Sequence, residues 1–195
     1  MAGLLSSEPT QPSGLPHTLT LHDGRRCQLR PIEPKDAARL QRFVRSLSDE
    51  SAHQRFFASV HELSPAQLKR FTSDDDPHEF AIIALDCASG ADPLIVGTAR
   101  CLRADGDATE FAVTIADAWQ GAGLGSILFD RLLNEARQRG IERIEGETLV
   151  DNDRMLKLAR SRGFRVETDP SDPSARRLTL ELGRQDPAGA ITQTR

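Results

Sequence analysis

Three glycines fall within five positions in the segment QGAGLG, residues 120–125, directly before an amphipathic stretch typical of a helix. The first N–H groups of a helix have no partner inside it and lie at the positive end of its dipole, so they attract anions. Glycines leave room for a phosphate there, because they carry no Cβ. The spacing therefore indicates a main-chain cradle for a diphosphate. A tight strand-to-helix turn with close helix packing explains the same glycines equally well.

Two familiar phosphate loops do not fit this segment. A Walker loop needs Gly-Lys followed by Ser or Thr, and the chain contains no Gly-Lys pair. A dinucleotide-binding fingerprint favours glycine or alanine where Ser126 stands, and it follows a buried strand directly, whereas DAWQ intervenes here. A phosphate at these glycines would therefore belong to a different class of site.

Other reactive side chains form no recognisable constellation. His53 and His61 lie eight residues apart, outside the spacing of a zinc motif, so we expect no metal. Cys27, Cys87 and Cys101 form no CxxC pair. They indicate a reduced, cytoplasmic setting rather than a disulfide framework.

The composition is that of a soluble globular chain of 195 residues, 38% hydrophobic and 28% charged. A net charge of −4 gives no electrostatic basis for binding nucleic acid or an anionic membrane. No apolar run approaches the roughly 18 residues of a membrane helix, and the N-terminus lacks the pattern of a signal peptide. We therefore expect a cytoplasmic monomer or homodimer with no membrane or nucleic-acid partner.

Hydrophobic patterning predicts one domain over residues 16–184, between flexible tails at 1–15 and 185–195. We expect strands at 25–32, 79–87, 94–102, 110–117, 141–150, 164–168 and 176–182, and helices at about 35–47, 49–60, 64–73, 122–139 and 152–162.

These elements predict an α/β fold. The closely spaced strands before residue 118 favour antiparallel pairing. Strand 110–117, helix 122–139 and strand 141–150 form a βαβ unit, in which the two strands pair in parallel. The helix places Leu124, Leu128 and nearby apolar side chains in one row that packs on a sheet. We expect a mixed sheet of about seven strands with helices on both faces.

The segment QGAGLG resembles the Q/R-x-x-G-x-G/A signature of the GNAT superfamily of N-acetyltransferases. The likeness covers roughly residues 18–183 and includes, in order, LRPIEPKDAARLQRFVRSLSDES, ELSPAQLKRF, EFAVTIADAWQGAGLGSILFDRL and NDRMLKLARSRGF. These segments are similar to the acetyltransferase domain of bacterial protein-lysine acetyltransferases. In that group the domain is often fused to an acyl-CoA-synthetase-like or a cyclic-nucleotide-binding part.

The resemblance implies acetyl-CoA as the co-substrate, with its pyrophosphate on the N–H groups between Gly121 and Ser126. The strand around Val113 to Ile115 would hold the pantetheine arm and offer an N–H to the thioester carbonyl. Asn152 matches a family asparagine that contacts the cofactor, and it also suits a helix N-cap. The implied cofactor-binding residues are Val113, Thr114, Ile115, Gln120, Gly121, Ala122, Gly123, Leu124, Gly125, Ser126 and Asn152.

Attack of an amine on a thioester needs a base, because only about one lysine side chain in two thousand is uncharged at neutral pH. Glu110 stands where the resembling lysine acetyltransferases carry their catalytic glutamate. Partial burial makes a carboxylate a better base, and we expect Glu110 to be partly buried. A solvent-facing charge at a strand end is the alternative reading of Glu110. Glu147, on the adjacent parallel strand, is the second candidate base.

Many members of the superfamily use a tyrosine in the final helix to protonate the departing thiolate. The chain contains no tyrosine, and Ala159 occupies that position. Water or the proton of the incoming amine would then do this work. The resemblance predicts transfer of an acetyl group from acetyl-CoA to a primary amine, with a protein lysine as the acceptor. A small-molecule acceptor, or a sensor module that binds acyl-CoA without turnover, remains open.

Overall fold

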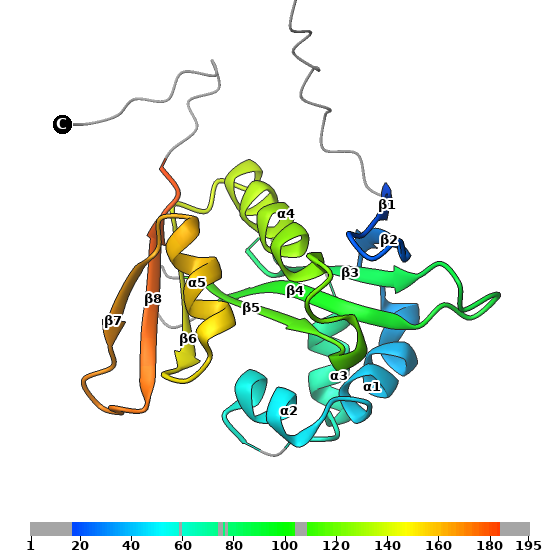
Figure 1. Ribbon diagram of the computed structural model, residues 1–195, viewed down its shortest axis with the longest axis horizontal. Coiled ribbons are helices and arrows are strands. Elements are labelled where there is room, and N and C mark those ends of the chain that lie inside the picture. Colours follow the sequence, from blue (N-terminus) through cyan, green and yellow to red (C-terminus); the bar gives the residue numbers. More distant parts are fainter. Residues whose placement is uncertain (1–16, 59, 74–75, 77, 104–108, 184–195) are drawn as a thin grey trace, which may run out of the picture.

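Eight strands form one sheet in the order β1-β2-β3-β4-β5-β6-β8-β7 (Figure 1). The computed structural model describes residues 17–58, 60–73, 76, 78–103 and 109–183. The tails expected at 1–15 and 185–195 lie outside these residues. The elements are β1 (His17–Thr20), β2 (Arg26–Pro31), η1 (Pro34–Asp36), α1 (Ala37–Arg45), α2 (Asp49–Phe56), α3 (Pro65–Thr72), β3 (Phe80–Asp86), β4 (Ile95–Arg103), β5 (Thr109–Ile115), η2 (Asp117–Trp119), α4 (Leu124–Gln138), β6 (Arg143–Leu149), α5 (Asp153–Ser161), β7 (Arg165–Thr168) and β8 (Ala175–Glu181).

The predicted fold class is confirmed, with one strand more than the sequence indicates. Neighbouring strands pair antiparallel except β5 and β6, which pair in parallel as the βαβ pattern predicts. The additional strand is β1, which pairs with β2 at the edge of the sheet. Its four residues HTLT alternate between half-buried and exposed, so no buried apolar run marks it in the sequence.

Helices cover both faces of the sheet (Figure 1). On one face α4 and α5 pack over an apolar cluster that we call the α4 core, which includes Leu124, Leu128, Phe129, Leu132, Leu133, Ala136, Phe111 and Phe164. On the other face, a second cluster lies under α1, α2 and α3. This α1–α3 core comprises Ile32, Leu40, Phe43, Val44, Leu47, Ala52, Leu63, Ala81, Ile83, Leu85 and Ile95.

The helix that follows the glycine loop packs closely on the sheet. All the apolar side chains predicted to form its buried row lie in the α4 core. A Cβ at Gly97 of β4 would lie 2.8 Å from Leu128 Cδ1. The close approach of α4 to the sheet therefore depends on the glycine of β4.

None of the helices in the described part of the chain combines the length and apolar character that crossing a membrane requires.

Candidate active site

The glycine loop joins β5 to α4, and its three glycines differ in backbone conformation. Gly121 and Gly123 have φ of +79° and +89°, a region that L side chains rarely adopt, so the turn itself explains both. Gly125 lies in the first turn of α4 without a positive φ, and a Cβ there would meet Ile115 Cγ1 at an ordinary 3.6 Å. Neither the turn nor helix packing requires Gly125. A main-chain anion site in the first turn of α4 would give a separate reason for a residue without a side chain at this position.

A diverging pair of strands lies beside this loop. The parallel pairing of β5 with β6 comprises only Thr109↔Ile144 and Glu110↔Glu145. Beyond Glu110, residues 111–115 of β5 pair with β4 on one edge and have no strand partner among the described residues on the other. The free edge carries the backbone groups of Val113, Thr114 and Ile115, which can hydrogen-bond an extended ligand.

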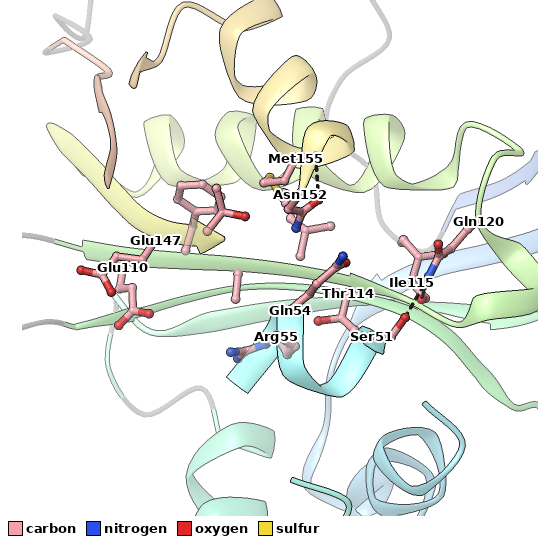
Figure 2. A pocket seen from close by; sticks show the side chains of 14 residues that line it. Ser51, Gln54, Arg55, Glu110, Thr114, Ile115, Gln120, Glu147, Asn152 and Met155 are labelled. Carbon is pink, nitrogen blue, oxygen red and sulfur yellow. Dashed lines mark hydrogen bonds between the residues drawn. The ribbon is translucent and has the colours of Figure 1, made fainter. Parts of the chain in front are cut away.

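A cleft of about 600 Å³, open to solvent, follows this edge (Figure 2). Residues of α2, β5, β6 and α5 line it: Ser51, Gln54, Arg55, Glu110, Phe111, Ala112, Val113, Thr114, Ile115, Gln120, Glu147, Thr148, Asn152 and Met155. The structure thus brings the expected strand residues, Gln120, Asn152 and both candidate bases to one cleft. Gly121, Ala122, Gly123, Leu124, Gly125 and Ser126 form the loop and the first turn of α4 and do not line the cleft itself.

Glu110 and Glu147 lie at one end of the cleft, where a second, acidic hollow is lined by Glu110, Glu145, Gly146, Glu147 and Arg177. The expectation that Glu110 is partly buried is wrong: its side chain is exposed, because it stands at the open end of the cleft. Burial raises the pKa of Glu147, and the carboxylates of Asp169 and Glu110 raise it further against the opposing charge of Arg177.

Helix α2 forms one wall of the cleft, and Asp117 holds it in place. The Asp117 carboxylate accepts hydrogen bonds from Ser48 N at 3.0 Å and from the hydroxyls of Ser48 and Ser51 at 2.7 Å. Gln120 Nε2 donates to Ser51 Oγ at 3.1 Å and to the Ile115 carbonyl at 3.3 Å. The segment before the glycine loop therefore fixes α2 against β5.

Helix α5 forms the opposite wall. Asn152 is its N-cap, since Asn152 Oδ1 accepts the Met155 N–H at 3.1 Å, and the same side chain lines the cleft. The capping role is thus confirmed, while contact with a cofactor stays a prediction. Ala159, at the position of the family tyrosine, is fully buried and supplies no proton donor.

Sequence reasoning missed the arginines that surround this site. Arg154 and Arg162 belong to the α5 region and lie beside the glycine loop: Arg154 Nη1 donates to Gln120 Oε1, and Arg162 Nη2 donates to Ser126 Oγ. Arg162 also pairs with Asp130 at 2.9 Å. The segment NDRMLKLARSRGF contains both arginines, but nothing in their spacing shows that α5 folds back onto a loop some thirty-five residues earlier. Among the described residues, no group of three or more His, Cys, Asp or Glu side chains could hold a metal ion.

Comparison with known proteins defines the class to which this fold and cleft belong. The model of the Acetyltransferase (GNAT) family matches residues 44–164, the segment that contains the α2 wall, β5, the glycine loop and α5. The chain therefore belongs to the GNAT acetyltransferase family.

Individual relatives agree with this assignment. The chain is 33% identical to Acetyltransferase PA5475 of Pseudomonas aeruginosa over 154 residues, which cover 78% of this chain and 82% of that protein. It is 32% identical to Acetyltransferase Pat of Mycolicibacterium smegmatis over 132 residues, covering 67% of this chain but only 38% of Pat. The chain thus spans well under half the length of Pat.

Solved structures show the same architecture. The GNAT domain of S. lividans PAT superposes with a TM-score of 0.72 at 31% identity, covering 85% of this chain and 96% of that domain. The fold is also shared with yncA from Salmonella typhimurium, solved with its cofactor acetyl-CoA, at a TM-score of 0.63 and 18% identity over 82% of this chain and 96% of that one.

Proposed function

We propose that this acetyltransferase moves the acetyl group of acetyl-CoA to a primary amine, with a protein lysine as the acceptor and Glu110 as the general base. One observation carries the proposal: a single cleft runs along the free edge of β5 from Gln120, the residue just before the three glycines, to Glu110. A donor anchored by its diphosphate at the loop would reach the two carboxylates with its acyl end.

Each part of the cleft has a task in this chemistry. The N–H groups at the start of α4 bind the diphosphate, with Gly125 giving it access. Acetyl-CoA supplies the thioester, and an N–H of the β5 edge stabilises negative charge as it develops on the carbonyl oxygen. Glu110 accepts a proton from the ammonium of the acceptor, either directly or through water, so that the neutral amine can attack. Because Ala159 offers no donor, the thiolate takes its proton from water or from the amine.

The exposed position of Glu110 suits a large acceptor. A base at the open end of the cleft can be reached by a lysine side chain on a protein surface, whereas a closed pocket would admit only small amines. The resemblance of the sequence to bacterial protein-lysine acetyltransferases supports the same choice of acceptor.

The test is release of CoA from acetyl-CoA in the presence of an acceptor protein, followed by mass spectrometry of the modified lysines. We expect kcat to fall at least about tenfold in Glu110→Gln, because a general base typically contributes about a hundredfold or more, while the Kd for acetyl-CoA changes little. The matched control is Glu167→Gln, which removes an exposed carboxylate on β7, outside the cleft.

Three results would count against the proposal. Equal turnover in Glu110→Gln and wild type would remove Glu110 from the mechanism. Tight binding of acetyl-CoA without turnover across many proteins and amines would favour an acyl-CoA-binding sensor. Turnover with small amines alone would exclude a protein acceptor.

A further inference from the structure

Two arginines lie on the acceptor side of the cleft without a carboxylate partner. Arg100 of β4 is only 4% exposed, and its guanidinium lies 4.2 Å from the centre of the Phe71 ring and donates to the Phe71 carbonyl at 3.4 Å. Arg55 of α2 is half-buried and stacks on Phe56 at 4.8 Å. Within the described part of the chain, neither guanidinium forms an ion pair.

Holding these charges together is unfavourable in the absence of an anion. Burial, together with the nearby charge of Arg55 and against the opposing charge of Glu79, lowers the pKa of Arg100 to about 9. Burial also lowers the pKa of Arg55, against the opposing charge of Glu110. A buried cation that lacks a partner costs several kcal/mol. An anion bound between the two guanidinium groups would offset this cost.

A third polar group at the same place also lacks a partner. Thr114 Oγ1 is buried and makes no hydrogen bond. Thr114 and Arg55 line the cleft and also a small inner hollow beneath α1 and α3, with space for about one water molecule. The remaining polar residues that line this hollow are Arg100 and Thr98. Two guanidinium groups without a carboxylate partner among the described residues, and one hydroxyl without a hydrogen bond, therefore lie around the place where the cleft meets the inner hollow. Guanidinium and hydroxyl groups together suit a carboxylate, which accepts hydrogen bonds through two oxygens.

The Glu110 end of the cleft has the opposite charge. Glu110 and Glu147 lie there, as Figure 2 shows, and the Arg55 guanidinium points from α2 toward that end. Arg100 is in register with Ala112, two residues along β5 from Glu110, which is a distance of about 7 Å along the strand. One molecule with an amine and a carboxylate separated by several bonds can reach both the glutamates and the arginines.

We propose that Arg55, Arg100 and Thr114 form a carboxylate subsite, so that the amine acceptor carries a carboxylate several bonds from its reactive nitrogen. The proposal rests on the proposed function for the amine end and on the arginines alone for the carboxylate end. A free amino acid, a C-terminal lysine, or a lysine followed by an acidic residue meets this description. A carboxylate at the far end of a dicarboxylic acyl group on CoA is a second source of the same chemistry.

The subsite itself is tested by the thermal unfolding of the full chain in increasing concentrations of glutarate, with sodium chloride at equal ionic strength as the reference. We expect glutarate to raise the wild-type midpoint by about 3 °C near saturation. Arg55→Gln and Thr114→Val are expected to lose most of this rise, whereas Arg45→Gln, which removes an exposed arginine outside both hollows, keeps it. Because removal of the buried Arg100 endangers folding, Arg55→Gln is the decisive variant. The proposal is overturned if glutarate raises the wild-type midpoint no more than sodium chloride does. It is also overturned if glutarate raises the midpoint of Arg55→Gln as much as that of wild type.

The source of the carboxylate is tested by kinetics with matched substrates. Nα-acetyl-L-lysine and its C-terminal amide share the same reactive amine, and acetyl-CoA and glutaryl-CoA differ by a terminal carboxylate. We expect kcat/KM with acetyl-CoA to be at least about tenfold higher for the acid than for the amide, and this ratio to approach one in Arg55→Gln. A preference for glutaryl-CoA over acetyl-CoA with both the acid and the amide would show that the carboxylate belongs to the acyl group. That result would overturn its assignment to the amine acceptor.

Failure of the proposed function gives a different result. If neither lysine derivative is acetylated although acetyl-CoA binds, turnover is absent and the glutarate measurement alone decides on the subsite. If Arg55→Gln slows the acid and the amide equally, with glutarate still bound, the arginines only position α2 and the proposal is overturned.

Discussion

The two carboxylates at the open end of the cleft are not equivalent. Glu147 lies on β6 opposite Arg177 of β8, and burial together with Asp169 and Glu110 raises its pKa. The charged form of Glu147 is therefore disfavoured in the folded protein. Glu110 stands where the diverging strands leave the acceptor side open. A raised pKa makes a carboxylate a stronger proton acceptor, so Glu147 stays the second candidate base. The open position of Glu110 favours it as the first candidate, because a large acceptor can reach it.

Glu147→Gln is expected to make the fold more stable at neutral pH. A carboxyl whose pKa is raised by folding binds its proton more tightly in the folded than in the unfolded state, so stability is lost as pH rises through the raised value. The glutamine variant does not titrate and keeps this stability. Urea unfolding between pH 4 and 8 measures the free energy of unfolding of both proteins. The advantage of Glu147→Gln over wild type should grow above about pH 4.5. A difference that is constant with pH would contradict this explanation.

Gly125→Ala separates the two explanations of the glycine loop. The position has room for a Cβ and no positive φ, so stability should be unchanged or higher by up to about 1 kcal/mol. The new methyl group would stand in the first turn of α4, beside the N–H groups that we propose bind the diphosphate. We therefore expect the Kd for acetyl-CoA in calorimetry to rise at least about tenfold.

The control for this variant is Gly121→Ala, which should lose stability because Gly121 has φ of +79°. Unchanged affinity in Gly125→Ala would mean that the third glycine serves local packing alone.

The sequence predicts those site residues that one segment supplies. The spacing of the glycines is itself a signal, whereas Glu110 and Asn152 become candidates only through the resemblance of their segments to the GNAT superfamily. Arg100 could not be found in this way, since the strand that contains it reads as an ordinary apolar strand and its importance arises only when α2 brings Arg55 near it. Glu110 was expected to be partly buried because the sequence does not reveal how soon β5 and β6 diverge.

At the scale of elements, periodicity predicts helices and long strands well. The row on α4 is buried as predicted, because a helix that packs on one side repeats its apolar residues. The strand β1 is not predicted, because a short strand at the edge of a sheet does not need a repeating pattern of buried apolar residues. It is placed instead by the turn at Gly24, which has φ of +85°, and by the Asp23–Arg25 pair beside that turn.

Asp36, at the start of α1, fixes this helix to β2 and η1. Its fully buried carboxylate accepts hydrogen bonds from Arg30 at 2.6 and 2.8 Å, from Arg39 at 2.9 Å and from Glu33 N at 3.0 Å. Burial alone would raise the pKa of Asp36, but the hydrogen bonds outweigh burial and lower the pKa to about 2. The ionised form is therefore strongly favoured by folding.

Asp36→Asn is expected to lower the free energy of unfolding at pH 7 by about 2 kcal/mol. A depressed pKa gives stability that is present above the unfolded value near 4 and is lost as pH falls toward 2. The difference in the free energy of unfolding between wild type and Asp36→Asn, measured with guanidinium, should therefore shrink as pH falls from about 4 toward 2. Asp49→Asn, at an exposed position on α2, serves as the control. A gap as large at pH 2.5 as at pH 7 would show that charge is not the cause.

At the scale of the whole molecule, one sheet separates two cores and one cleft adjoins both. Val113 and Ile115 pack against the α4 core, while Thr114 between them lines the hollow beneath α1 and α3. The site is built from alternate residues of one strand, so it cannot open without disturbing the packing on both faces. We therefore expect the two cores to unfold together.

Trp119, the single tryptophan of the chain, reports on this coupling. It lies just before the glycine loop, packs against the α4 core and has the Arg25 guanidinium 4.2 Å from its ring centre. We expect its fluorescence and far-UV circular dichroism to follow one transition. Acetyl-CoA at 100 times its Kd should shift both signals equally, by about 2.7 kcal/mol. Gly125→Ala should keep the single transition and lose about half of the shift or more at the same ligand concentration, as a tenfold or larger rise in Kd requires. Separate midpoints for the two signals would show instead that the cores are independent and that the ligand stabilises only the side it touches.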